Sequence, residues 1–125
     1  MTATPSKSQL LYIGNDPDLS KASAALLRSA GYKVRSTNPS HAGEALRESR
    51  YSAVILCATL SSEEADHIVE AVRYGHQDVP IVTVQVGMLG NLPHPASSVV
   101  VDALQGPHAF VGAIKSATLV RQKAS

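Results

Sequence analysis

Ser52-Ala53-Val54-Ile55-Leu56-Cys57 is the stretch of this 125-residue chain that most constrains its fold. The run is continuously apolar from Ala53 to Leu56 and lacks the alternation of a strand that faces water on one side. Short runs of this kind are typical of parallel strands that are covered on both faces. We therefore predict a buried strand over residues 52–57, with the Cys57 thiol at its carboxyl end.

Amphipathic segments with helix-start signals separate this run from other strand-like runs. Asp16 and Asn38 each precede a proline, and this pairing of a capping side chain with proline is typical of a helix start. Ser61 and Glu64 have the spacing of a capping box, and Gly31 is placed to end the first helix. The other runs that favour strands are residues 9–14, 32–37, 80–84 and 98–101.

Strands that alternate with helices through short connections predict an α/β domain with a parallel sheet and right-handed crossovers. Five strands in this arrangement suggest a flavodoxin-like doubly wound sheet of order 2-1-3-4-5, with helices on both faces. We expect one domain over residues 9–121, a flexible N-terminal tail at 1–8 and a C-terminal tail at 122–125. The first helix is expected to turn four positions towards the sheet: Leu19, Ala22, Leu26 and Ala30.

Composition narrows the class of protein further. The net charge is +1 and charged residues make up 17% of the chain, so no bulk field points to nucleic acid or to an anionic membrane. No run approaches the roughly 20 apolar residues of a membrane helix. A single cysteine excludes a disulfide within the chain and favours a reducing, cytoplasmic setting.

The chain resembles the receiver domains of response regulators over about residues 9–119. The resemblance implies the flavodoxin-like fold and a role in two-component signalling through contacts with another signalling protein, a kinase or an output domain. It also makes a homodimer one expected form. The segments that carry the resemblance are Leu11-Tyr12-Ile13, Asp16-Pro17, Ala30-Gly31-Tyr32, Ala53-Val54-Ile55-Leu56 and Pro80-Ile81-Val82.

The resemblance also locates departures from the chemistry of that family. Receivers hold magnesium with two acidic residues after the first strand, and the matching positions here are Gly14 and Asn15, followed by Asp16. The aspartate that accepts the phosphoryl group matches Cys57. Magnesium is a hard ion that prefers carboxylate oxygens, so we expect no magnesium cofactor at these degenerate positions.

Two further positions of the family's site are replaced. The switch threonine or serine matches Gln85, although Thr83 is close by. The lysine that pairs with the phosphoryl group matches Gly106, and the proline after it is kept as Pro107. His108 could meet an anion there weakly, below about pH 6.5.

These losses predict a pseudo-receiver, which is a non-enzymatic module that acts through protein contacts without aspartyl phosphorylation. Two alternatives remain open. The first is a phosphorelay receiver with unorthodox phosphoacceptance. The second is a redox or small-ligand sensor that uses Cys57, although a small, inert, buried thiol is the simpler interpretation of this residue.

The segment 84–97 departs from the family's architecture. Receivers place a fourth helix there, but two glycines, two prolines and Asn91 oppose one, so we expect this helix to be shortened or absent. Met88, Leu89 and Leu92 then form a candidate partner surface, or cover the edge of the sheet. Glu63, His67 and Glu70 share one helix face, for which a solvated charged surface is the favoured interpretation over a metal site.

Overall fold

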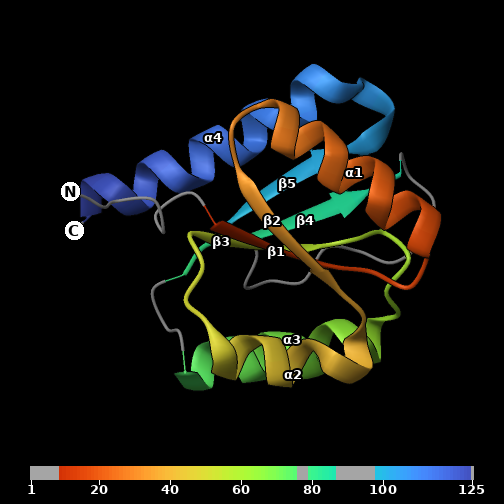
Figure 1. The fold of residues 1–125 in the computed structure, drawn as a ribbon, viewed down its shortest axis with the longest axis vertical. Helices are drawn as coiled ribbons and strands as arrows, with labels where there is room; N and C mark the ends of the chain where they lie inside the picture. Colours follow the sequence, from red (N-terminus) through yellow and green to blue (C-terminus); the bar gives the residue numbers. More distant parts are fainter. Residues whose placement is uncertain (1–8, 76–78, 87–97, 125) are drawn as a thin grey trace.

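The computed structural model describes residues 9–75, 79–86 and 98–124. Five strands form one parallel sheet in the order β2-β1-β3-β4-β5, which confirms the predicted topology. Helices α1 and α4 cover one face, and α2 and α3 cover the other (Figure 1). The elements are β1 (Gln9–Ile13), α1 (Pro17–Ser29), β2 (Lys33–Thr37), α2 (Pro39–Glu48), β3 (Ala53–Leu56), α3 (Ser62–Gly75), β4 (Ile81–Gln85), β5 (Val99–Asp102), the short 3₁₀ helix η2 (Ala103–Gln105) and α4 (Pro107–Ala124).

The predicted helix-start signals form the expected caps. Asp16 Oδ1 accepts hydrogen bonds from the backbone N–H groups of Asp18 and Leu19 at the start of α1. Asn38 Oδ1 accepts from the N–H of His41 at the start of α2. Gly31 follows α1 with a φ of 101°, a left-handed conformation that suits glycine at a helix end.

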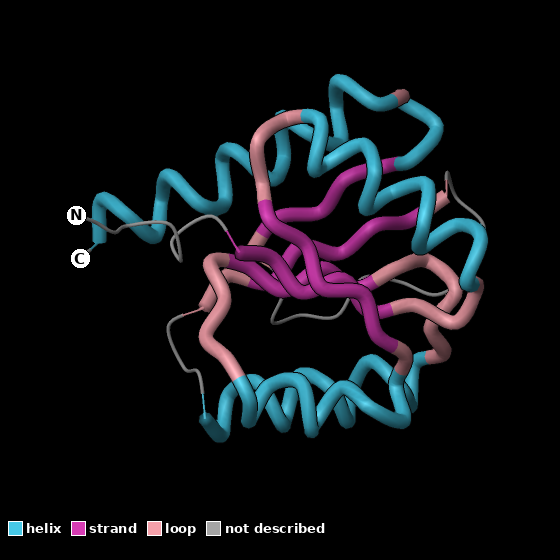
Figure 2. Tube along the Cα trace, viewed as in Figure 1, coloured by secondary structure: helices cyan, strands magenta, loops and turns pink. Residues whose placement is uncertain are grey.

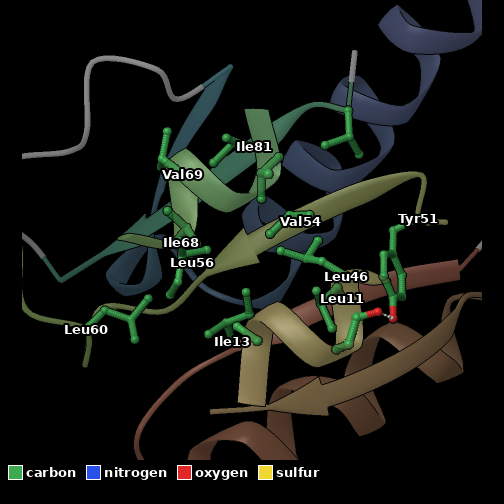
Figure 3. Packing of buried hydrophobic residues seen from close by; sticks show 14 residues of the cluster. Leu11, Ile13, Leu46, Tyr51, Val54, Leu56, Leu60, Ile68, Val69 and Ile81 are labelled. Atoms are coloured by element: carbon green, nitrogen blue, oxygen red, sulfur yellow. Dashed lines mark hydrogen bonds between the residues drawn. The ribbon is translucent and has the colours of Figure 1, made fainter. Parts of the chain in front are cut away.

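Each face of the sheet has its own hydrophobic cluster (Figure 2 shows the sheet between its two helical layers). Side chains along a strand alternate between the two faces, so Leu11 and Ile13 of β1 join one cluster while Leu10 and Tyr12 join the other. Figure 3 shows the cluster on the α2–α3 side. There Val54 and Leu56 of β3 pack with Ile68 and Val69 of α3, as the amphipathic pattern of α3 predicts.

The expected inward face of α1 is only partly right. Leu26 packs against the α1–α4 cluster as predicted, whereas Leu19 is 42% exposed, and Ala22 and Ala30 are also exposed. The helix buries Ser20, Ala24 and Leu27 instead, so it is rotated by about one residue, or roughly 100°. Small side chains at two of the three buried positions let α1 approach the end of the sheet closely.

Three expectations concern the ends of elements. The N-terminal tail (1–8) and the helix expected to be shortened or absent between the fourth and fifth strands (the segment 87–97) lie outside the described residues. Helix α4 continues to Ala124, so most of the expected C-terminal tail at 122–125 is helical. In the described part of the chain, no helix combines the length and apolar character needed to cross a membrane.

Candidate functional site: the carboxyl ends of β1 and β3

The candidate site lies where the two central strands end. The register of β1 and β3 closes with Ile13 beside Leu56, so the next pair along the strands is Gly14 and Cys57. The backbone N–H of Cys57 donates to the carbonyl of Ile13 at 3.0 Å, which continues the ladder by one hydrogen bond. The fold therefore brings two of the sequence-predicted positions side by side in the middle of the sheet.

Gly14 lies in a tightly packed position where a side chain would press on its neighbours. A Cβ atom placed on this residue would lie 3.0 Å from Cys57 Cβ, 3.3 Å from Ser20 Oγ and 3.4 Å from Cys57 Sγ. The closest of these distances is shorter than ordinary van der Waals contact. The absent side chain at position 14 thus lets β1, β3 and α1 meet closely.

The side chain of Cys57 belongs to the hydrophobic cluster on the α1–α4 side. The residue is 5% exposed and lies in the same cluster as Tyr12 and Ile55. Burial raises the pKa of the Tyr12 hydroxyl, and the nearby Cys57 side chain adds to this effect. Cys57 is therefore a packed thiol.

Asn15 connects the loop after β1 to the loop after β3. Its backbone N–H donates to Thr59 Oγ1 at 2.9 Å. Its side-chain Nδ2 donates to the carbonyl of Thr59 at 3.1 Å and to Glu64 Oε1 at 2.9 Å. A single amide group, which carries a positive partial charge on its hydrogens, thus bridges a carbonyl oxygen and a carboxylate oxygen.

Glu64 is shared between this bridge and the start of α3. The N–H of Ser61 donates to Glu64 Oε1, and the N–H of Glu64 donates to Ser61 Oγ, which confirms the predicted capping box. The Ser61 backbone N–H, and then the Asn15 amide, hold the pKa of Glu64 below its ordinary value, because both stabilise the carboxylate. The N-terminus of α3 is tied to Asn15 through this one side chain.

The donor set does not fit a magnesium ion. Gly14 offers no side-chain oxygen, and Asn15 presents amide hydrogens, not an oxygen, to Thr59 and Glu64. The carboxylate of Asp16 accepts from two N–H groups in the first turn of α1, so it acts as a helix cap. Magnesium requires several oxygen ligands in octahedral geometry, and these residues do not supply them.

The switch and lysine positions lie at the ends of β4 and β5. Gln85 is the last residue of β4, partly buried and in register with Asp102. Thr83 is in register with Leu56, one residue before Cys57. Gly106 has a φ of 95°, a conformation that L side chains rarely adopt, so this backbone disfavours a lysine there. His108 is exposed in the first turn of α4.

Other predicted positions lie away from this site or cannot be placed. Met88, Leu89 and Leu92 fall outside the described residues. Glu63, His67 and Glu70 are exposed on α3. Among the described residues, no group of three or more histidine, cysteine, aspartate or glutamate side chains could hold a metal ion.

Sequence reasoning missed three partners of the site. Tyr12 shares a buried cluster with Cys57, Ser20 Oγ lies 3.3 Å from where a Cβ of residue 14 would be, and Thr59 binds Asn15. The partner Tyr12 could have been found from the sequence, because side chains along a strand alternate between the two faces of the sheet. This alternation places Tyr12 and Gly14 on the same face as Ile55 and Cys57. Nothing in the sequence pattern pairs Asn15 with Thr59, since this contact depends on loop conformation.

The comparisons with known proteins concern the fold. No family model and no curated protein matches the chain. The receiver domain of a sensor histidine kinase from Pseudomonas aeruginosa PAO1, described with magnesium coordinated in its active-site cleft, is similar over 89% of this chain and 97% of its own, with a TM-score of 0.77 and 17% identity. A CheY-like receiver domain from Methanospirillum hungatei JF-1 is similar over 94% of this chain and 98% of its own, with a TM-score of 0.76 and 15% identity. Vibrio cholerae CheY4 is similar over 88% of this chain and 98% of its own, with a TM-score of 0.74 and 14% identity. The chain has the receiver fold.

Proposed function

We propose that this chain is a pseudo-receiver, a signalling module of the response-regulator type that works through protein contacts without aspartyl phosphorylation. The bridge made by Asn15 carries the proposal. Its Nδ2 group links the Thr59 carbonyl at 3.1 Å and Glu64 Oε1 at 2.9 Å, so a neutral amide satisfies two oxygens that a cation would otherwise attract. The two loops are held together without a metal ion or a phosphoryl group.

The packing around Cys57 supports the same proposal. A phosphoryl group needs a nearby acceptor oxygen and positive charges that stabilise the transferring group. The thiol here is buried in the same cluster as Tyr12, and a side chain at the neighbouring position 14 would press on Cys57 and Ser20. The backbone at Gly106 disfavours a lysine. Each residue replaced in the family's site is accommodated by the local packing or backbone.

A module of this kind signals by being bound. Its partner would be a kinase or an output domain in the cytoplasm, and the recognition would be of protein and not of nucleic acid, because the net charge of +1 provides no basic field. The bonded loops would present one fixed arrangement to that partner instead of switching between two.

Incubation with acetyl phosphate and magnesium, followed by intact mass measurement, tests the proposal. We expect no stable gain in mass under conditions that phosphorylate an ordinary receiver run in parallel. A stable gain of one phosphoryl group would support the unorthodox phosphorelay alternative and overturn the proposal.

The sensor alternative makes a different prediction. A redox or ligand sensor through Cys57 requires a thiol that reacts quickly in the folded protein. We expect labelling by a thiol reagent at neutral pH to be slow, and to become fast only in denaturant. Fast labelling of the folded chain would favour the sensor.

A further inference from the structure

The face formed by α2 and α3, on the opposite side of the sheet from the buried Cys57 side chain, is hollowed in two places. One hollow of about 700 Å³ lies at the carboxyl ends of the two helices, where Leu46, Arg47, Arg50 and Tyr74 line it. A second hollow of about 370 Å³ lies towards their amino ends, where Pro39, Glu64, His67 and Ile68 line it. Gly43 and Ala71 line both hollows, so the two hollows form one groove. The residues at the middle of this groove have the smallest side chains.

The two ends of this groove differ in charge. Arg47 and Arg50 lie at the carboxyl-terminal end, and neither forms an ion pair with a described residue. Glu48, which lies between them, is already paired with Arg35 at 2.6 Å. At the other end Glu64 lines the smaller hollow, and Glu63 precedes it in the first turn of α3 without lining the hollow. The groove is therefore basic at one end and acidic at the other.

The two ends of the groove are also complementary in shape, because one end carries a projecting side chain and the other a hollow. Tyr74 projects from the basic end and is 92% exposed, an unusual position for a large aromatic side chain. At the acidic end, the smaller hollow has an apolar floor of Ala42, Ile68 and Ala71, with the polar side chains of Ser40 and His67 also lining it. A hollow with an apolar floor and polar lining suits a tyrosine, whose ring is apolar and whose hydroxyl needs a hydrogen-bond partner.

We propose that the α2–α3 face is the interface of a two-fold symmetric homodimer, and that the occupant of the groove is the same face of a second copy of this chain. A two-fold axis near Gly43 and Ala71 reverses the direction of the partner's helices. Tyr74 lies three residues after Ala71 and Ile68 three residues before it, about 4.5 Å along the helix axis on either side. The axis thus seats Tyr74 of each copy in the smaller hollow of the other.

The same symmetry pairs the charges. Arg47 and Arg50 of one copy lie against the first turn of α3 in the other, where Glu63 and Glu64 are placed. Both the aromatic anchor and the charged pairs occur twice, as an isologous interface requires. Tyrosine and arginine are the residue types most often responsible for binding energy at interfaces, and the charged pairs set the orientation. The proposal holds whether or not the chain accepts a phosphoryl group.

Sedimentation equilibrium of the full chain over a range of concentrations tests the interface. We expect the wild-type chain to show a reversible monomer–dimer equilibrium that weakens with added salt. Tyr74→Ala should raise the dissociation constant about tenfold or more, because it removes the anchor from both halves. Lys21→Glu, an exposed charge reversal on α1, should leave the constant unchanged.

Charge-reversal variants test the pairing of the two ends most directly. The pair Arg47→Glu with Arg50→Glu, and separately the pair Glu63→Lys with Glu64→Lys, should each give a monomer. An equimolar mixture of these two variants should dimerise again, because every acidic end then meets a basic end. Circular dichroism and thermal unfolding check that both variants are folded. A wild-type chain that stays monomeric at all concentrations overturns the proposal, as does a dimer that Tyr74→Ala leaves unchanged or a mixture that stays monomeric.

Discussion

The two faces of the sheet are built from the same strands but differ in the polar groups that they bury. On the α2–α3 side the core is aliphatic apart from Tyr51, whose hydroxyl donates to the Ala45 carbonyl at 2.9 Å (Figure 3). On the α1–α4 side the core includes Tyr12 and Cys57, next to Gly14, where an added Cβ would lie 3.0 Å from Cys57 Cβ. The two faces therefore differ at the carboxyl ends of the central strands, where the packing on the α1–α4 side is tight.

This difference bears on what position 14 can hold. A Cβ atom added to Gly14 would lie 3.0 Å from Cys57 Cβ and 3.3 Å from Ser20 Oγ, so these neighbours would have to move slightly to admit a side chain. An acidic residue introduced at this position is then expected to destabilise the fold.

The largest expected effect follows from matched substitutions at two glycines. Gly14→Asp forces a carboxylate into the space beside Cys57 and Ser20, and we expect a loss of about 3 kcal/mol or more in the free energy of unfolding. Gly112→Asp on α4 places the same group at an exposed position where a Cβ meets nothing within 4 Å, so its effect should stay within about 1 kcal/mol. Urea unfolding measures both. Equal losses would show that position 14 is not tightly packed.

A smaller effect is expected from the two buried tyrosines. Tyr12→Phe and Tyr51→Phe each remove a hydroxyl from a buried tyrosine, one on each face. Tyr51→Phe should cost about 1 kcal/mol at neutral pH because it loses the hydrogen bond to the Ala45 carbonyl, and Tyr12→Phe should cost less. A larger loss for Tyr12→Phe than for Tyr51→Phe would contradict this ranking of the two faces.

Tyr12 adds a pH dependence that can be measured in the same series. Its folded pKa is raised by burial above the unfolded value of about 10, so its contribution to stability is complete below that pH and is lost as the pH rises above it. Urea unfolding between neutral pH and about pH 11 should show this alkaline loss in the wild-type chain and a smaller loss in Tyr12→Phe. Identical profiles for the two proteins would contradict the assignment.

The smallest effect concerns Glu64 at the edge of the site. Its pKa is held low by the Ser61 N–H and by the Asn15 amide, so Asn15→Ala should move this pKa upwards towards the ordinary value. An NMR titration of the Glu64 carboxyl follows the change. An unchanged pKa of Glu64 would remove Asn15 as its partner.

The sequence predicted the framework because framework signals are local. The apolar run over residues 52–57, the Asp16 and Asn38 caps and the capping box of Ser61 each depend on a few neighbouring residues, and all are confirmed. The inward face of α1 was only partly right because hydrophobicity favours Leu19 over Ser20, whereas the close approach of α1 to Gly14 requires a small side chain. The degenerate positions were located through the family resemblance.

The closure of the site could not be predicted from the same signals. The bridge from Asn15 to Glu64 joins residues 49 positions apart, and the direction of an amide group depends on two loop conformations. The contact between Gly14 and Cys57 follows from strand register, which the alternation along β1 and β3 constrains only once the strands are paired.

An NMR titration with magnesium tests the central claim, that the Asn15 amide takes the place of a cation between the two loops. We predict that the side-chain amide signal of Asn15 and the backbone amide of Cys57 do not shift in the wild-type chain at millimolar magnesium. Asn15→Asp should respond, because it removes the bridging hydrogens and adds a carboxylate beside Glu64 and the Thr59 carbonyl. A saturable shift of both signals in the wild-type chain would contradict the account.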